Sequence, residues 1–312
     1  MPLIVTENLT KKFGEFLAVD ELCLTVEAGE IVALLGPNGA GKTTTVRMLG
    51  SILKPTSGRA TIAGYDVVQD ARQVRSVVGL LTEFPGLYHR MRADAYLHFF
   101  GELQRVPRAR RRERIEELMR RFGMWDERRK RLGEYSKGMR QKIALIRAMI
   151  HDPQVLFLDE PTSAMDPQSA KMVRDAVAEL RSSHRAVILC THNLPEAEML
   201  ADRIAIIKEG RIIALGTPLD LKRALLGSPL LEVQLAQPLD GLLSAVESVV
   251  AIEEKGETWF RYRAQAPGET NPLLVRRLTE EGANIITVSE VPGSLEEVYL
   301  RIVEEGECSP ML

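Results

Sequence analysis

The residues best placed to do chemistry form a glycine-rich run that fits the phosphate-binding pattern G-x-x-x-x-G-K-[ST] at every fixed position. The run is Gly36, Pro37, Asn38, Gly39, Ala40, Gly41, Lys42 and Thr43. Its glycines let backbone N–H groups turn toward a phosphate, its lysine adds positive charge, and its threonine hydroxyl can bind Mg²⁺. An apolar run at 31–35 precedes it and a plausible helix at 43–49 follows. This strand–loop–helix context predicts a site for nucleotide phosphates.

Two more apolar strands end in residues that suit the same chemistry. The run 155–158 is followed directly by Asp159 and Glu160, and the run 186–190 is followed by Thr191 and His192. Asp159 is placed to support Mg²⁺, and Glu160 is placed to polarise a water beside the terminal phosphate. The alternatives are a solvated strand end for Glu160 and a structural role for His192. Because ligands bind at the carboxyl edge of such sheets, we expect both side chains at the site.

Two further segments gain meaning only in combination. Ser136 and Gly138 stand at the start of a helix, where a hydroxyl and free N–H groups can meet an anion, although alone they would suggest an ordinary helix cap. The segment 161–167, which contains Asp166, follows the acidic strand.

Taken together and in this order, the motifs resemble the nucleotide-binding domain of ABC ATPases over about residues 3–221. The resemblance implies ATP and Mg²⁺ as cofactors, with Phe13 stacked on the adenine and Thr44 completing the phosphate loop. It implies that Glu160 is the general base, that Asp159 and Thr43 serve Mg²⁺, and that His192 senses the γ-phosphate. It also implies a head-to-tail dimer, in which Ser136 and Gly138 contact the γ-phosphate held by the other subunit and Asp166 lines the seam.

The sequence departs from the family pattern at two places. The signature Leu-Ser-Gly-Gly-Gln has Lys137 in place of its first glycine and Met139 in place of its glutamine. Glu83 stands where the family has a glutamine that contacts Mg²⁺ and the attacking water near the joint with the membrane partner. A carboxylate can still bind Mg²⁺, but when ionised it cannot donate a hydrogen bond.

The chain is long enough for one large and one small domain. Short apolar strands alternating with helices predict an α/β core. The resemblance implies that this core, at 1–227, has the P-loop NTPase fold of ABC ATPases, including a helical subdomain at about 86–150. The order strand, helix, strand, strand, helix, strand, helix predicts a small α+β ferredoxin-like domain at 228–305, with a regulatory or dimerisation role, and a tail at 306–312. Within that domain, Asn271 and Pro272 are expected to open a helix, and Ser294 to cap the last one.

Composition and charge exclude several classes. No apolar run approaches the roughly 18 residues of a membrane span, the first residues lack a secretory signal, and three isolated cysteines predict neither a zinc site nor disulfides, which suits a cytosolic setting. The segment 105–131 holds 12 basic and 5 acidic side chains. Three interpretations stay open: a solvated helix face with Glu–Arg pairs, contact with anionic lipid heads, or nucleic-acid binding, which the lack of interleaved aromatics disfavours.

The expected function is the ATP-hydrolysing subunit of an export-type ABC transporter. The last segment resembles the C-terminal extension of drug- and polymer-exporter subunits, notably at 295–300. Such a subunit works at the cytoplasmic face of the membrane as a peripheral protein. Its partners are a separate permease and a second ATP-binding subunit, identical or not, with no specific nucleic acid. One alternative is a soluble ABC ATPase that remodels another complex. The other is a P-loop kinase or GTPase, which is disfavoured by the segment around Ser136 and by His192.

Overall fold

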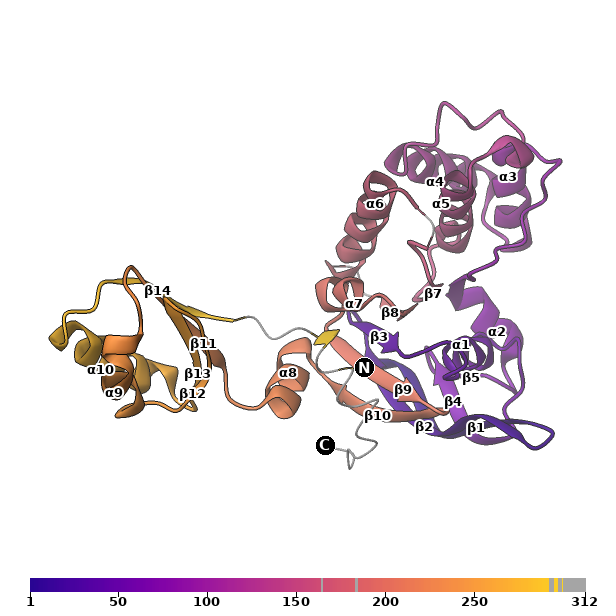
Figure 1. The fold of residues 1–312 in the computed structure, drawn as a ribbon. Helices are drawn as coiled ribbons and strands as arrows, with labels where there is room; N and C mark the ends of the chain where they lie inside the picture. The colour runs from indigo at the N-terminus through magenta and orange to yellow at the C-terminus, as the bar shows by residue number, and fades with distance from the viewer. Residues whose placement is uncertain (164, 183–184, 292–294, 297–298, 300–312) are drawn as a thin grey trace. The chain divides into compact units, whose positions relative to one another are not determined.

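A computed structural model describes residues 1–163, 165–182, 185–291, 295–296 and 299. The chain divides into two compact units between Pro218 and Leu219 (Figure 1). This division lies before the boundary at 227 expected from the sequence, so that the helix α8 (Pro218–Leu226) groups with the second unit. None of the helices in the described ranges combines the length and apolar character needed to cross a bilayer.

The first unit is built on a six-stranded sheet with the order β10-β9-β3-β8-β7-β6, in which all neighbours are parallel except the edge strand β10. Every residue of β3, β7 and β8 is buried, as expected for wholly apolar strands covered on both faces. The strands are β3 (Ile31–Leu35), β6 (Val78–Leu81), β7 (Val155–Asp159), β8 (Ala186–Thr191), β9 (Arg203–Lys208) and β10 (Arg211–Gly216).

This sheet separates two hydrophobic clusters, because alternate residues of each strand point to opposite faces. In β7, Leu156 and Leu158 belong to one cluster, whereas Val155 and Phe157 belong to the other. The first cluster includes residues of the helical subdomain, and the second includes residues of a four-stranded antiparallel sheet, β2-β1-β4-β5. The strands of that sheet are β1 (Pro2–Phe13), β2 (Phe16–Glu27), β4 (Ser57–Ile62) and β5 (Tyr65–Asp66).

Helices connect the strands and carry several of the expected site residues. The helices of the core are α1 (Lys42–Leu49), α2 (Ala71–Val77), α6 (Pro167–Ala178), the short 3-10 turn η2 (Glu179–Ser182) and α7 (Leu194–Leu200). The helical subdomain consists of α3 (Ala93–Leu103), α4 (Arg108–Arg121), the 3-10 turn η1 (Leu132–Glu134) and α5 (Lys137–Met149). Tyr96, Phe122 and Tyr135 are buried among these helices. These helices lie where the helical periodicity between 93 and 150 predicts helices.

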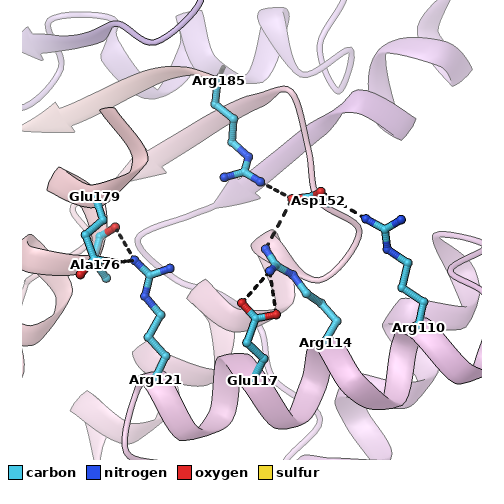
Figure 2. Close-up of polar contacts among 8 residues, drawn as sticks. All are labelled: Arg110, Arg114, Glu117, Arg121, Asp152, Ala176, Glu179 and Arg185. Carbon is cyan, nitrogen blue, oxygen red and sulfur yellow. Dashed lines mark hydrogen bonds and ion pairs between the residues drawn. The ribbon is translucent and has the colours of Figure 1, made fainter. Parts of the chain in front are cut away.

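The arginines of α4 attach the helical subdomain to the core. Asp152, in the turn between α5 and β7, accepts hydrogen bonds from Arg110 and Arg114 of α4 at 3.4 and 3.5 Å and also pairs with Arg185, just before β8 (Figure 2). Arg121, at the end of α4, pairs with Glu179. Asp152 adopts a left-handed φ of 58°, which asparagine and aspartate tolerate better than most residues. Much of the basic run is thus used in contacts within the molecule.

After α8, the second unit runs strand, helix, strand, strand, helix, strand through the described residues, in the order predicted for 228–305. Its antiparallel sheet has the order β12-β13-β11-β14, with a core that includes Val233, Phe260, Tyr262 and Leu274. The elements are β11 (Leu230–Leu235), η3 (Asp240–Leu242), α9 (Leu243–Glu247), β12 (Ile252–Lys255), β13 (Trp259–Arg263), α10 (Pro267–Glu280) and β14 (Ile285–Glu290). The ferredoxin-like class stays a prediction, and the expected cap at Ser294 lies outside the described residues.

One helix start is wrong in the sequence analysis. The helix α10 begins at Pro267, and Pro272 lies inside it. Proline is well tolerated in a first helical turn, so Pro267 can serve as the start that was assigned to Pro272. The side chain of Asn271 does not cap the helix, because its Oδ1 accepts a hydrogen bond from the Tyr262 hydroxyl at 2.7 Å.

Candidate nucleotide-binding site

The glycine-rich loop joins β3 to α1, as the sequence predicts. At two of its positions, a residue larger than glycine would clash with neighbouring backbone. A Cβ at Gly36 would lie 2.3 Å from the carbonyl oxygen of Ile207, and one at Gly41 would lie 2.5 Å from that of Ala18. Gly41 also has a φ of 104°, which L-residues with side chains rarely adopt. The loop therefore depends on glycine at both positions to pass close to β9 and β2.

Lys42 is buried, and its ammonium group lies over the loop itself. Its Nζ donates hydrogen bonds to the carbonyl oxygens of Gly36 at 2.6 Å and Pro37 at 3.0 Å. The Thr45 hydroxyl donates to the Gly41 carbonyl at 3.0 Å and fixes the first turn of α1. A positive charge and the N-terminus of an eight-residue helix thus share one concavity, which favours an anion.

Thr43, at the end of the loop, is in direct contact with Asp159. The Thr43 hydroxyl donates to Oδ2 of Asp159 at 2.9 Å. Burial raises the pKa of Asp159, and the nearby Glu83 carboxylate raises it further, while the bond from Thr43 and the charges of Lys42 and Arg47 lower it. The hydroxyl and the two carboxylates are hard oxygen donors of the kind that Mg²⁺ prefers, and a cation would relieve their repulsion. Within the described ranges, no three His, Cys, Asp or Glu side chains form a metal site by themselves, so nucleotide oxygens would have to complete the shell.

Glu160 and His192 are in direct contact at the ends of β7 and β8. Oε1 of Glu160 lies 2.7 Å from Nδ1 of His192 and accepts the His192 backbone N–H at 3.1 Å. The backbone of Glu160 has a φ of 51°, a strained value for a residue with a side chain, and its N–H donates to the Cys190 carbonyl at 2.9 Å. Gln141 of α5 reaches the Glu160 carbonyl at 3.4 Å. His192 therefore holds the carboxylate at Oε1, and Cys190 and Gln141 hold the backbone of Glu160.

A cavity of about 340 Å³ is shared by the phosphate loop and by carboxylates at the ends of the strands. Its walls contain the phosphate loop from Asn38 to Thr44 together with Glu83, Asp159 and Glu160. Phe16 and Ala18 of β2 also line it. The expected adenine partner, Phe13, is half exposed with the Lys11 ammonium over its ring, and it pairs across the hairpin with Phe16. Sequence reasoning missed Phe16, because its place on the cavity depends on the register of this hairpin.

The remaining expected site residues lie apart from this cavity. Ser136 is exposed and caps α5, with its hydroxyl accepting the Met139 N–H at 3.2 Å. Asp166 is exposed and caps α6, and hydrogen bonds from Ser169 lower its pKa. A Cβ on Gly138 would lie 3.9 Å from Cγ of Met165, which places the Ser136 segment near the Asp166 segment. In the part of the chain that the structure describes, none of these three residues lines the phosphate-loop cavity.

Comparison with known proteins finds relatives that bind ATP, in agreement with a nucleotide-binding site. The family model described as "ABC transporter" matches residues 19–163. The chain is 37% identical over 303 residues to the daunorubicin resistance ATP-binding protein DrrA3 of Streptomyces coeruleorubidus, covering 96% of this chain and 95% of that protein. It is 34% identical to the Nod factor export ATP-binding protein I of Burkholderia lata, with 95% of each chain covered. A solved ATP-binding subunit of an ABC transporter superposes with a TM-score of 0.67 at 27% identity, covering 71% of this chain and 92% of that one.

Proposed function

The chain belongs to the ATP-binding proteins of ABC transporters, and from this premise we propose that it hydrolyses ATP to power export through a separate membrane permease. Its enzymatic activity is that of the family, an ATPase. The observation that carries the proposal is the placement of Glu160, oriented by His192, on the wall of the phosphate-loop cavity. The export direction rests on relatives that are named for drug resistance and for Nod factor export.

The roles of the site residues follow from their positions. The loop N–H groups and Lys42 bind the phosphates, and Phe13, with Phe16 beside it, packs against the base. Thr43, Asp159 and Glu83 would hold Mg²⁺, which when bound would supply positive charge to the phosphates. Glu160 accepts a proton from the attacking water, and His192 orients Glu160 and contacts the terminal phosphate.

The second ATP-binding subunit accounts for the residues that lie outside the cavity. Ser136, Gly138 and Asp166 do not line the cavity of their own chain, but a head-to-tail partner would bring its copies to this one. We propose two ATP molecules between two such subunits, with closure on ATP and opening after hydrolysis. The observation in support is that Ser136 and Asp166 are exposed although their side chains cap α5 and α6.

A second cavity of the first unit suits the permease. It has a volume of about 220 Å³ and is lined by residues of α2, α3, α5 and β6 and of the segment after α1. Its walls are mostly apolar, as at Ile52, Val78 and Phe100, and also contain arginines. Ile52 is 59% exposed, and Phe84, which follows β6 in the chain, is 79% exposed. Exposed apolar groups around a groove favour docking of a partner segment. We propose that a cytoplasmic segment of the permease binds here, which makes the protein peripheral at the cytoplasmic face of the membrane.

Inverted membrane vesicles from cells that co-express this chain with a candidate membrane permease would test the proposal. The wild-type chain with ATP is expected to drive accumulation of the exported compound, and Lys42→Ala is expected to abolish it. If the chain neither binds these vesicles nor changes its ATPase rate with the permease present, a soluble ATPase that remodels another complex becomes the better description. The unit at 228–305 would then be the first place to look for its partner.

A further inference from the structure

Glu196 is a buried glutamate that was not among the site residues expected from the sequence. It contacts the segments that carry Glu160 and His192. It stands in the first turn of α7, and only 2% of its surface is exposed. A carboxylate is costly to bury unless hydrogen bonds replace its water. Its presence in the core of an ATPase unit therefore calls for specific partners.

Each carboxylate oxygen of Glu196 accepts a hydroxyl from a different segment. Oε1 accepts the Thr162 hydroxyl at 2.6 Å, and Oε2 accepts the Thr191 hydroxyl at 2.9 Å. Thr162 lies two residues after Glu160, and Thr191 lies immediately before His192. One carboxylate thus bridges the two loops that carry the pair.

The local structure of α7 leaves this carboxylate available for bridging. Asn193 caps the helix by accepting the Glu196 N–H at 3.0 Å. In the usual capping box, the acidic side chain at this third position would accept the N–H of the cap residue in return. Here the Asn193 N–H donates to the Thr191 hydroxyl oxygen at 3.1 Å instead, so the Glu196 side chain is free to face the threonines.

We propose that Glu196 is a positioning residue for ATP hydrolysis, because it fixes the loop after β7 and the loop after β8 relative to each other. This inference rests on the proposed role of Glu160. The strained φ of Glu160 requires support from its surroundings, and the bridge supplies it by holding Thr162, two residues after Glu160, to Thr191. Without it, the Glu160 carboxylate and His192 would lose their common orientation, whereas the phosphate loop would be untouched.

The test compares two substitutions at Glu196 in the full-length protein. Glu196→Ala is expected to lower kcat by about 10–100-fold, since misplacement of about 1 Å costs up to about 100-fold, with KM for ATP little changed. Glu196→Gln is expected to recover most of kcat, because its amide oxygen accepts one hydroxyl and its NH₂ donates to the other threonine oxygen. Unchanged kcat in Glu196→Ala, or an equal loss in both variants, would overturn the proposal.

Two controls separate positioning from general destabilisation. Thr191→Val removes one arm of the bridge, and Thr6→Val removes a buried hydroxyl of the antiparallel sheet that bonds to the Leu24 backbone. Both should lower Tm, but only Thr191→Val should lower kcat. If both lower kcat in proportion to Tm, Glu196 is merely structural. This comparison also decides the matter if Glu196→Ala does not fold.

The double variant Glu160→Gln with Glu196→Ala separates this inference from the proposed function. If Glu196 acts through Glu160, adding Glu196→Ala to Glu160→Gln should lower kcat much less than it does in the wild-type background. Fully multiplicative losses would overturn the positioning role. If Glu160→Gln alone keeps normal turnover, the proposed role of Glu160 fails instead, and this outcome is visible without any Glu196 variant.

Discussion

Glu160 and His192 follow neighbouring parallel strands directly, and Oε1 of Glu160 lies 2.7 Å from Nδ1 of His192. The carboxylate also accepts the His192 backbone N–H at 3.1 Å, so the two residues are joined through both side chain and main chain. A carboxylate held in this way beside a phosphate-binding loop is suited to accept a proton from water.

Glu160→Gln removes the base but keeps the shape of the side chain. We expect ATP binding to persist and turnover to fall by about 10²–10⁴-fold, the usual contribution of a general base. Steady-state phosphate release with binding measured by fluorescent ATP would check this. A variant that binds ATP and turns over at the wild-type rate would remove Glu160 from the chemistry.

Asp159→Asn should stabilise the nucleotide-free protein at neutral pH. Because burial raises the folded-state pKa of Asp159 above its ordinary value of 3.8, the folded chain binds its proton more tightly than the unfolded chain. The free energy of unfolding therefore falls as the pH rises from 3.8 through the raised folded-state pKa of Asp159. Asparagine carries no charge and avoids that loss. We expect a higher Tm by a few degrees at pH 7 and a shrinking difference as the pH is lowered toward 3.8.

Asp166→Asn is the matched control, since the pKa of Asp166 is lowered by hydrogen bonds from Ser169. Its ionised form stabilises the folded state, so the asparagine variant should be less stable at neutral pH and equal to wild type in acid. If both variants change Tm in the same direction at pH 7, the assignment of opposite shifts is wrong. Hydrolysis with Mg²⁺ should fall in Asp159→Asn even though Tm rises.

Asp152→Asn tests the attachment of α4 to the core (Figure 2). Asparagine tolerates the left-handed φ of 58° but loses the charge that faces Arg110, Arg114 and Arg185. We expect a loss of about 1 kcal/mol in the free energy of unfolding, measured in urea, because three guanidinium groups share one carboxylate. Glu116→Gln breaks a single exposed i,i+4 pair with Arg120 and should cost less. Equal costs would mean that the shared carboxylate adds nothing.

Deletion of the residues after Gly227 should leave ATP binding unchanged. Among the described residues, those that line the phosphate-loop cavity all lie before this point. The described residues of the second unit have a hydrophobic core of their own. Equilibrium binding of ATP to the truncated and full-length chains would measure this. Loss of binding in a truncated chain that is otherwise folded would show that the two units depend on each other.

The parts of the site that depend on local sequence could be predicted from it. The phosphate loop needs glycine where backbone passes close, and strand ends bring Asp159, Glu160 and His192 to one edge. Glu196 could not be found in this way, because its pattern with Asn193 indicates only a helix start. Its burial depends on two threonines that the fold brings together from separate loops.

Further differences separate the sequence-based predictions from the structure, and most of them arise from strand pairing or long-range contacts. Phe16 lines the cavity because of its register opposite Phe13, which no periodicity reveals. The start of α10 was missed because two prolines, Pro267 and Pro272, offered equivalent local signals. The grouping of α8 with the second unit reflects long-range contacts rather than the Gly227 turn signal.

The central claim is that two subunits enclose ATP, and it is tested most directly by the mass of Glu160→Gln in solution. Light scattering after gel filtration should give a monomer without nucleotide and a dimer with ATP and Mg²⁺, since slow turnover preserves the closed state. Ser136→Ala and Asp166→Ala, added singly, should weaken that dimer without loss of ATP binding. A persistent monomer that binds ATP would contradict the arrangement in which Ser136 and Gly138 act across the interface.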